Sequence, residues 1–587
     1  MKKNYEYLYS GSTSALDPNS GDLFTGYRIP AASLGAPTSP QTADQLREVS
    51  SRLNEGMNAV EMGTIQAGVF DTIPKQHMKE MNRLTKLTGS EISVHAPIID
   101  PAGFSQEGGW SDANRASAER QLYGVIERSH ELNPEGRVPV TIHADNVAGH
   151  EYRVYDDGKG GEEMIIGVDQ ETGQMTTAKR VKRYYPETGN KEQIISAKDE
   201  LNVINRSNWS NHLLGLRQYK KQADELIEPA LREGAPYFAK LAKGIELTDE
   251  EKRIVMQCQN KINRGASFLN NTNALIRSLY NQAYKFGDEG DKRMLEGGSE
   301  EYKDLINKSN QSDFMRSVQY QSGAVESLIH SLSSAEPKIY KPIDEFAIEK
   351  ASQTIGNIAF ESYKKYGDTA PMISLENTPA GQAISRAEDL KKLIVKSRER
   401  FVEQAVKKGL STSNAEKQAE EIIGATWDVG HINLLRKGGF SKEQIVEETK
   451  KIAPYVKHVH LTDNFGYSDS HLPIGMGEVP VKEMMKELEK AGYSGRHIAE
   501  AGGFVKEFKT SPHPYVLEAF GSPLYSAYMQ PFWNQARGSQ GAYSAGYGTM
   551  LPEQHFSIYG SGFSTLPVEL GGQQQGKQSR FSGTPTE

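Results

Sequence analysis

Histidine, aspartate and glutamate residues recur in this sequence at the ends of short apolar runs. Imidazole nitrogens and carboxylate oxygens bind zinc, manganese and iron, and carboxylates also transfer protons in acid–base catalysis. A single residue of this kind is usually structural, but six consecutive runs that each end in one favour a shared metal centre. The candidate metal ligands at or just after these ends are His95, His143, Glu376, Asp428, His431, His460, Asp469, His471 and Glu500.

The apolar runs have the length of β-strands and alternate with amphipathic segments that have the length of helices. This alternation predicts an α/β fold with a parallel sheet. Eight strands within about 285 residues favour a (β/α)₈ TIM barrel, which typically needs about 250 residues. The predicted strands are residues 27–32, 58–62, 92–95, 139–143, 371–376, 425–429, 456–461 and 496–500. The predicted helices include residues 42–55, 75–88, 111–132, 345–366, 441–455 and 481–491.

The barrel pattern is interrupted once and ends before the end of the chain. The interruption begins with a β-ribbon over residues 152–177 and continues as polar helices with Asn-rich turns, for example at residues 270–273. The last 50 residues are rich in Gly, Ser and Gln and are expected to be disordered. The segments are a polar leader (1–23), the first barrel half (24–148), a mostly helical insertion (149–344), the second barrel half (345–505), an aromatic extension (506–537) and the tail (538–587).

The composition restricts the chemistry of the predicted centre. The chain of 587 residues has one cysteine, Cys258, which excludes an intrachain disulfide and a thiolate-built zinc site. It has no run of 18 apolar residues and no apolar stretch at its N-terminus, so we expect a cytoplasmic protein without a membrane span. The net charge of −8 does not indicate a polyanion partner, although a local basic groove is compatible with it.

A parallel barrel would bring the candidate ligands together. All its strands open onto one face at their carboxyl ends, where barrel enzymes have their active sites. Four carboxylates at one mouth would repel each other, and divalent cations would offset that repulsion. His458 precedes His460 on the same predicted strand and is expected to point toward the helix layer instead.

Several segments of the two barrel halves resemble the endonuclease IV family (AP endonuclease family 2), which belongs to the xylose isomerase-like TIM barrels. The resemblance covers about half of the chain and neither the insertion nor the tail. It rests on the Glu-Asn-Thr-x-Ala-Gly-Gln run from Glu376 and on the Asp-x-His and Gly-x-Gly runs from Asp469. The similar segments are residues 94–97, 141–143, 375–382, 428–431, 460–463 and 469–477.

The resemblance implies a centre of three zinc ions, although manganese or iron would fit the same ligands. His95, His143 and Glu376 would hold the first ion, and Glu376 would bridge to the second. The second ion would also be held by Asp428, His460 and Glu500, and the third by His431, Asp469 and His471. The implied activity is cleavage of DNA at abasic sites in base excision repair, with Glu376 as the catalytic residue that accepts a proton from metal-activated water.

The substrate contacts implied by the resemblance differ from the family pattern. The loop after the second strand offers Gln66 rather than a basic residue, and the apolar wedge after His-Ala-Pro is Ile98-Ile99. Ser470 stands where the family has an arginine. The insertion offers replacement cations in the cluster Arg180, Lys182 and Arg183.

Two other functions fit the same residues. A xylose isomerase-like sugar isomerase or epimerase would need one divalent metal, held by the Glu, Asp, His and Glu subset of the ligands. A non-catalytic scaffold would bind a partner through the insertion and the tail. The substrate is accordingly DNA with abasic sites, a small phosphoester or a sugar. The presence of His95, His143 and Asp469 favours the phosphodiesterase.

Overall fold

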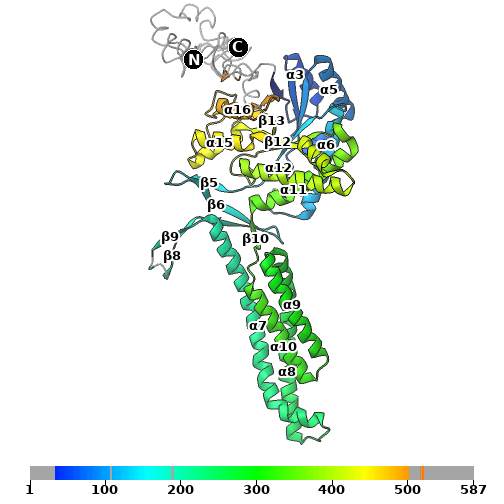
Figure 1. The fold of residues 1–587 in the computed structure, drawn as a ribbon, viewed down its shortest axis with the longest axis vertical. Helices are drawn as coiled ribbons and strands as arrows, with labels where there is room; N and C mark the ends of the chain where they lie inside the picture. Colours follow the sequence, from blue (N-terminus) through cyan, green and yellow to red (C-terminus); the bar gives the residue numbers. More distant parts are fainter. Residues whose placement is uncertain are drawn as a thin grey trace, which may run out of the picture. The chain divides into compact units, whose positions relative to one another are not determined.

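The computed structural model describes residues 33–105, 109–186, 189, 191–501, 516 and 519–520. The chain divides into two compact units, one of which is Glu162–Phe346, referred to below as the insertion unit. The other, the barrel unit, contains the strands and helices of the two predicted barrel halves (Figure 1). Among the described residues, no helix is both long and apolar enough to cross a membrane.

The barrel unit is built around eight parallel strands that close on themselves. Their order around the barrel is β1-β14-β13-β12-β11-β4-β3-β2. The predicted TIM barrel fold is therefore confirmed. The strands are β1 (Leu34–Pro37), β2 (Ala59–Gly63), β3 (Glu91–His95), β4 (Pro139–His143), β11 (Met372–Glu376), β12 (Ile423–Asp428), β13 (Val456–Leu461) and β14 (His497–Ala499).

The register of the strands places the candidate ligands at one level of the barrel. His143 is the partner of Glu376 in the β4–β11 pair, and Asp428 is the partner of His460 in the β12–β13 pair. The other residues of these strands are mostly apolar and buried, as expected for a parallel sheet covered on both faces. The ligand-type residues therefore lie at the carboxyl ends of strands that hydrophobic burial fixes in place.

Helices follow most strands and begin and end at recognisable signals. Helix 75–88 was predicted with these bounds and ends at Gly89, whose φ of 68° requires a residue that tolerates the left-handed region. Ser441 caps the helix before β13 through a reciprocal capping box with Gln444. The helices are α3 (Gln45–Asn54), α4 (Ala67–Thr72), α5 (Lys75–Thr88), α6 (Asp112–Ser129), α11 (Ile343–Tyr366), α12 (Ala387–Lys407), α13 (Thr412–Ile422), α14 (Val429–Asn433), α15 (Lys442–Ile452) and α16 (Val481–Lys490).

The first barrel strand differs from the prediction. Residues 27–32 lie outside the described residues, and the observed strand is β1 (Leu34–Pro37). Glycine and proline are rare in strands, so Leu-Gly-Ala-Pro gives no strand signal. Packing selects it nonetheless, because a Cβ at Gly35 would lie 2.7 Å from a methyl carbon of Ile498.

The insertion unit combines short strands with four long helices. The helices run side by side (Figure 1) around a core of buried apolar residues that includes Trp209, Ile262 and Leu328. The strands are β6 (Gly160–Asp169), β7 (Met175–Lys179), β8 (Val181–Tyr184), β9 (Glu192–Ile195) and β10 (Tyr340–Pro342), preceded by β5 (Glu151–Val154). The helices are α7 (Ala197–Ala242), α8 (Asp249–Phe286), α9 (Glu289–Asn310) and α10 (Phe314–Ser334).

One prediction for the insertion was wrong. The Asn-rich stretch 270–273, expected to be a turn, lies inside α8. Thr272 is buried there, and its hydroxyl donates to the carbonyl of Phe268 one turn earlier. Burial of this helix against its neighbours outweighs the low helix propensity of asparagine.

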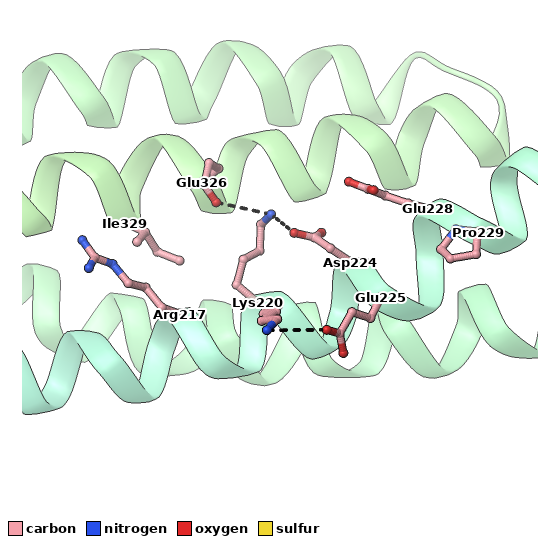
Figure 2. Close-up of a pocket in the computed structure, with 9 residues that line it drawn as sticks. Arg217, Lys220, Asp224, Glu225, Glu228, Pro229, Glu326 and Ile329 are labelled. Carbon is pink, nitrogen blue, oxygen red and sulfur yellow. Dashed lines mark hydrogen bonds and ion pairs between the residues drawn. The ribbon is translucent and has the colours of Figure 1, made fainter.

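A groove along α7 and α10 of the insertion unit has a volume of about 480 Å³ (Figure 2). Lys220 is almost fully buried in it and contacts Asp224 at 2.5 Å and Glu326 at 3.4 Å. Lys221 pairs with Glu225 in the same groove. These charges satisfy each other, as a helix interface requires of buried ions.

The ends of the chain are described only in part. The predicted leader (1–23) and disordered tail (538–587) lie outside the described residues. Within the predicted extension 506–537, Val516 and Phe520 are described, and both are buried.

Candidate metal centre

All nine candidate ligands come together at the carboxyl end of the barrel. They form several groups in which one nitrogen or oxygen atom of each member lies within 4.8 Å of the others, and three of these groups together include all nine ligands. The three groups are His95 with His143 and Glu376, Glu376 with Asp428, His460 and Glu500, and His431 with Asp469 and His471. Glu376 belongs to two of them.

Glu376 lies at the middle of this arrangement and is fully buried. Its Oε2 atom is 3.3 Å from Nε2 of His95 and 3.2 Å from Nε2 of His143, yet it has no hydrogen bond to either. Its Oε1 atom is 2.8 Å from Nδ1 of His460. A buried carboxylate oxygen without a hydrogen bond is costly, and a cation shared with the imidazoles would satisfy it.

Asp428 ends β12 and caps α14 with one of its two carboxylate oxygens. Its Oδ1 atom accepts hydrogen bonds from the backbone of Gly430 at 2.7 Å, the backbone of His431 at 3.0 Å and the hydroxyl of Thr462 at 2.6 Å. Its Oδ2 atom is buried and has no hydrogen-bond partner. One oxygen is thus occupied by structure, and the other remains available as a ligand.

Two histidines of the centre are oriented by backbone carbonyls. Nδ1 of His95 lies 2.9 Å from the carbonyl oxygen of Ala96, and Nδ1 of His431 lies 2.7 Å from that of Asn377. These contacts fix Nδ1 as the protonated nitrogen and leave Nε2 for the centre, as is usual for metal-binding histidines.

The third group depends on the loop after β13. Asp469 contacts His471 at 3.0 Å and His431 at 3.2 Å. His471 has a φ of 46°, a left-handed conformation that only glycine among the other described residues adopts. Non-glycine residues held in this region are strained, and such strain is typical of functional sites.

Asp463 holds this loop in place. Its Oδ2 atom accepts hydrogen bonds from the backbone of Gly475 at 2.9 Å and Gly477 at 2.8 Å, and its Oδ1 atom accepts from Asn464 and Val479. A Cβ at Gly477 would lie 2.3 Å from the Asp463 carboxylate, which explains why a glycine is needed there. Sequence reasoning quoted this aspartate and these glycines but assigned them no role.

The electrostatics of the centre are those of a network of ion pairs. Burial alone would raise the pKa of Glu376, but the neighbouring histidines, His460 first, hold that pKa well below its usual value. Burial lowers the pKa of His95, but Glu376 outweighs it and raises that pKa to about 9. Asp469 in the same way raises the pKa of His471 to about 9. In the metal-free chain, imidazolium protons therefore balance the carboxylates in place of cations.

His458 does not point toward the helix layer, so that prediction was wrong. Residues two apart on a strand face the same side, and His458 and His460 therefore both point into the barrel. There they meet Glu61 of β2, a residue that sequence reasoning missed. The available signal was a charged residue inside the apolar strand Ala59–Gly63.

The three predicted substrate contacts differ in exposure. Ile98 is 42% exposed and Gln66 is exposed as well, at the start of α4. Ile99 is buried, so the predicted Ile98-Ile99 wedge was wrong for its second member, because an apolar side chain after a strand end packs into the core. Ile65, Phe465 and Tyr467 are the other large apolar side chains exposed on loops after β2 and β13.

The cationic cluster predicted in the insertion is largely neutralised. Lys182 pairs with Glu192 at 2.7 Å, and Arg183 pairs with Glu200 through two contacts. Both side chains are therefore engaged in ion pairs within the insertion unit.

Comparison with known proteins finds a family match in the second half of the barrel. Residues 409–512 match the family model described as "Xylose isomerase-like TIM barrel". This part of the chain is therefore similar to xylose isomerase-like TIM barrels. This stretch contains six of the nine candidate ligands: Asp428, His431, His460, Asp469, His471 and Glu500.

Curated relatives match only a part of the chain. "Uncharacterized protein MJ1311" of Methanocaldococcus jannaschii is 37% identical over 73 residues, which are 12% of this chain and 24% of that protein. "Fructoselysine 3-epimerase" of Shigella flexneri is 29% identical over 77 residues, which are 13% of this chain and 27% of that enzyme. The chain thus spans about a quarter of the length of these relatives.

A solved structure described as a D-tagatose 3-epimerase-like protein aligns with 83% of this chain and 98% of its own, at 15% identity and a TM-score of 0.35. The curated relative with a named activity is called an epimerase. The comparisons support the xylose isomerase-like part of the predicted resemblance and do not single out endonuclease IV.

Proposed function

We propose that this protein is a divalent-metal-dependent enzyme that moves a proton on a sugar, as an epimerase or isomerase. The observation that carries the proposal is the group Glu376, Asp428, His460 and Glu500, which places two glutamates and two further ligands around one point at the barrel mouth. The buried, unpartnered oxygens of Glu376 and Asp428 fit a bound cation. The names of the relatives support this function over the endonuclease.

The chemistry needs a base, an acid and a means of stabilising negative charge. A divalent cation in the group would polarise a sugar carbonyl and its neighbouring hydroxyl. Glu376 and Glu500 both approach Nδ1 of His460, at 2.8 and 3.5 Å. One carboxylate takes a proton from the carbon beside the carbonyl, and the other returns a proton to the opposite face. The exposed side chains of Ile98 and Tyr467 would contact the sugar.

The structure also favours a second candidate, hydrolysis of a phosphodiester by a centre of the endonuclease IV type. The specific observation is the pair of flanking groups, His95 with His143 and His431 with Asp469 and His471, which a one-metal epimerase does not need. Three zinc ions would match the charge of a phosphodiester, and DNA with abasic sites would be the substrate. Glu376 would then accept the proton of the attacking water.

Metal content and product chemistry separate the two candidates. We expect the purified protein to incorporate deuterium from D₂O at one carbon of a ketose, detected by NMR across a panel of sugars, with at least one tightly bound divalent ion per chain by elemental analysis. An abasic DNA duplex should remain intact under the same conditions. Close to three ions per chain together with nicking beside the abasic site, and no exchange into any sugar, would replace the epimerase by the hydrolase.

The substitution Asp469→Ala is a second test that distinguishes the epimerase from the hydrolase. If the group around Glu376 acts alone, this substitution should change kcat by less than about tenfold and leave one ion bound, because Asp469 belongs only to the third group. In a hydrolase, it should remove one of three ions and most of the activity. Ser470→Ala, at an exposed neighbour that bonds only to Ser468, is the matched control for loop disturbance.

A further inference from the structure

Glu61 is a fully buried carboxylate inside the barrel, and the proposed reaction does not use it. It lies on β2, whose other side chains are apolar or absent. Its Oε2 atom forms a hydrogen bond of 3.0 Å with Nε2 of His458. Its Oε1 atom is 2.9 Å from Nε2 of His460, an ion-pair distance without the alignment of a hydrogen bond. Ser93 of the neighbouring strand donates a hydrogen bond to Oε2 at 2.8 Å. A buried charge with this many partners needs a reason to be there.

The ring of His460 faces the centre with Nδ1, whereas the rings of His95 and His431 face it with Nε2. His95 and His431 turn Nδ1 to a backbone carbonyl and Nε2 to the centre. His460 turns Nδ1 to Glu376 and Glu500 at the centre, and its Nε2 faces the barrel interior. Glu61 occupies the place that the carbonyl has for the other two.

We propose that Glu61 is a positioning residue that sets the tautomer and the ring orientation of His460. The negative charge of the carboxylate, 2.9 Å from Nε2 of His460, favours the tautomer protonated at Nε2, so that Nδ1 presents its lone pair to a cation held with Glu376 and Glu500. A carboxylate behind a ligating imidazole both fixes the ring and increases its basicity. This inference rests on the metal site of the proposed function. It adds Glu61, which faces the Nε2 side of the His460 ring, away from the cation.

His458 and Ser93 complete the arrangement. They bind the same carboxylate oxygen, Oε2, and thereby direct the other oxygen, Oε1, toward His460. His458 is buried and shares the inward face of β13 with His460. The two histidines therefore have different tasks, since one contacts the centre and the other holds Glu61.

Glu61→Gln is the direct test, with cobalt as the probe because its visible spectrum reports the ligands. We expect this variant to fold, as judged by circular dichroism, but to bind Co²⁺ about 10- to 100-fold more weakly than the wild type, with a changed d–d band. The glutamine amide still fills the space of the carboxylate but has no negative charge to hold the proton on Nε2. Glu91→Gln on β3 is the control, because Glu91 pairs with Arg496, is exposed and should leave Co²⁺ binding unchanged.

The outcomes separate this inference from the proposed function. If the wild-type chain itself binds no Co²⁺, the metal site is wrong. If the wild type binds Co²⁺ and Glu61→Gln binds it with the same affinity and spectrum, the positioning role is wrong. Loss of one ion per chain in Glu61→Gln, with the remaining ions bound as tightly as before, would also overturn the inference, because Glu61 would then be a ligand together with His458.

A measurement on the wild-type protein covers the case in which the variant does not fold. Nitrogen-15 spectra of the histidine rings in the zinc-loaded chain should show His460, identified by the signal missing in His460→Gln, as the tautomer protonated at Nε2. A His460 ring protonated at Nδ1 or bound through Nε2 would contradict the proposed orientation.

Discussion

Glu376→Gln is expected to lower kcat by about 10³-fold or more, because it removes a proton-transferring carboxylate and a charge that two ligand groups share. Metal content should fall as well, since the Oε2 atom of Glu376 is buried, has no hydrogen bond and lies between His95 and His143. Steady-state kinetics on the substrate identified by deuterium exchange, together with elemental analysis of the same preparation, measures both effects.

The matched control for this experiment is Glu447→Gln on α15. Glu447 is exposed and pairs only with Lys450, so the same chemical change there should leave kcat and metal content unaltered. A Glu376→Gln variant that keeps more than a tenth of the wild-type kcat with full metal content would remove Glu376 from the mechanism and with it the proposed reaction.

The positions of the candidate ligands could be predicted because they follow from backbone topology. Parallel strands present their carboxyl ends at one face, so a residue type repeated at strand ends must converge there. This argument needs only the correct strands, and seven of the eight predicted strands overlap observed ones. The exception, Leu34–Pro37, is set by close packing on Ile498 and Ala59, which leaves no periodic signal.

The contacts behind the ligands could not be predicted in the same way. Glu61 and His458 are 397 positions apart, and only the closure of the barrel brings them together. The hydrogen bonds of Asp463 to the loop that carries Asp469 depend on backbone amides, which every residue but proline has and which no pattern of side chains reveals.

The reaction was less predictable than the site, for a chemical reason. Imidazoles and carboxylates at a barrel mouth fit a one-metal proton transfer and a three-metal hydrolysis equally well. From the sequence, the Asp-x-His run in the loop after β13 favoured hydrolysis. The family match and the named relatives favour the epimerase, while the geometry shows all three ligand groups. The number of ions that the groups hold in solution is what distinguishes the two.

Removing the metal is expected to abolish turnover and to make the stability of the barrel fall at alkaline pH. In the metal-free chain, the folded pKa values of His95 and His471 are raised to about 9, above the value of about 6.5 for an unfolded histidine. The ion pairs of these imidazolium groups with Glu376 and Asp469 therefore stabilise the fold fully below about pH 6.5, and the stabilisation is lost as the pH rises through about 9.

The loaded protein should behave differently in the same pH range. Metal binding requires neutral imidazole, so a cation replaces the protons of His95 and His471 and keeps Glu376 and Asp469 paired at high pH. Thermal unfolding between pH 6 and 9.5, with chelator or with added divalent metal, should give a midpoint that drops by several degrees only in the chelated sample. Restoring metal to that sample should restore both the midpoint and the turnover. Two midpoints that fall in parallel with pH would show that the imidazoles are not exchanging protons for a cation, and that His95 and His471 are structural.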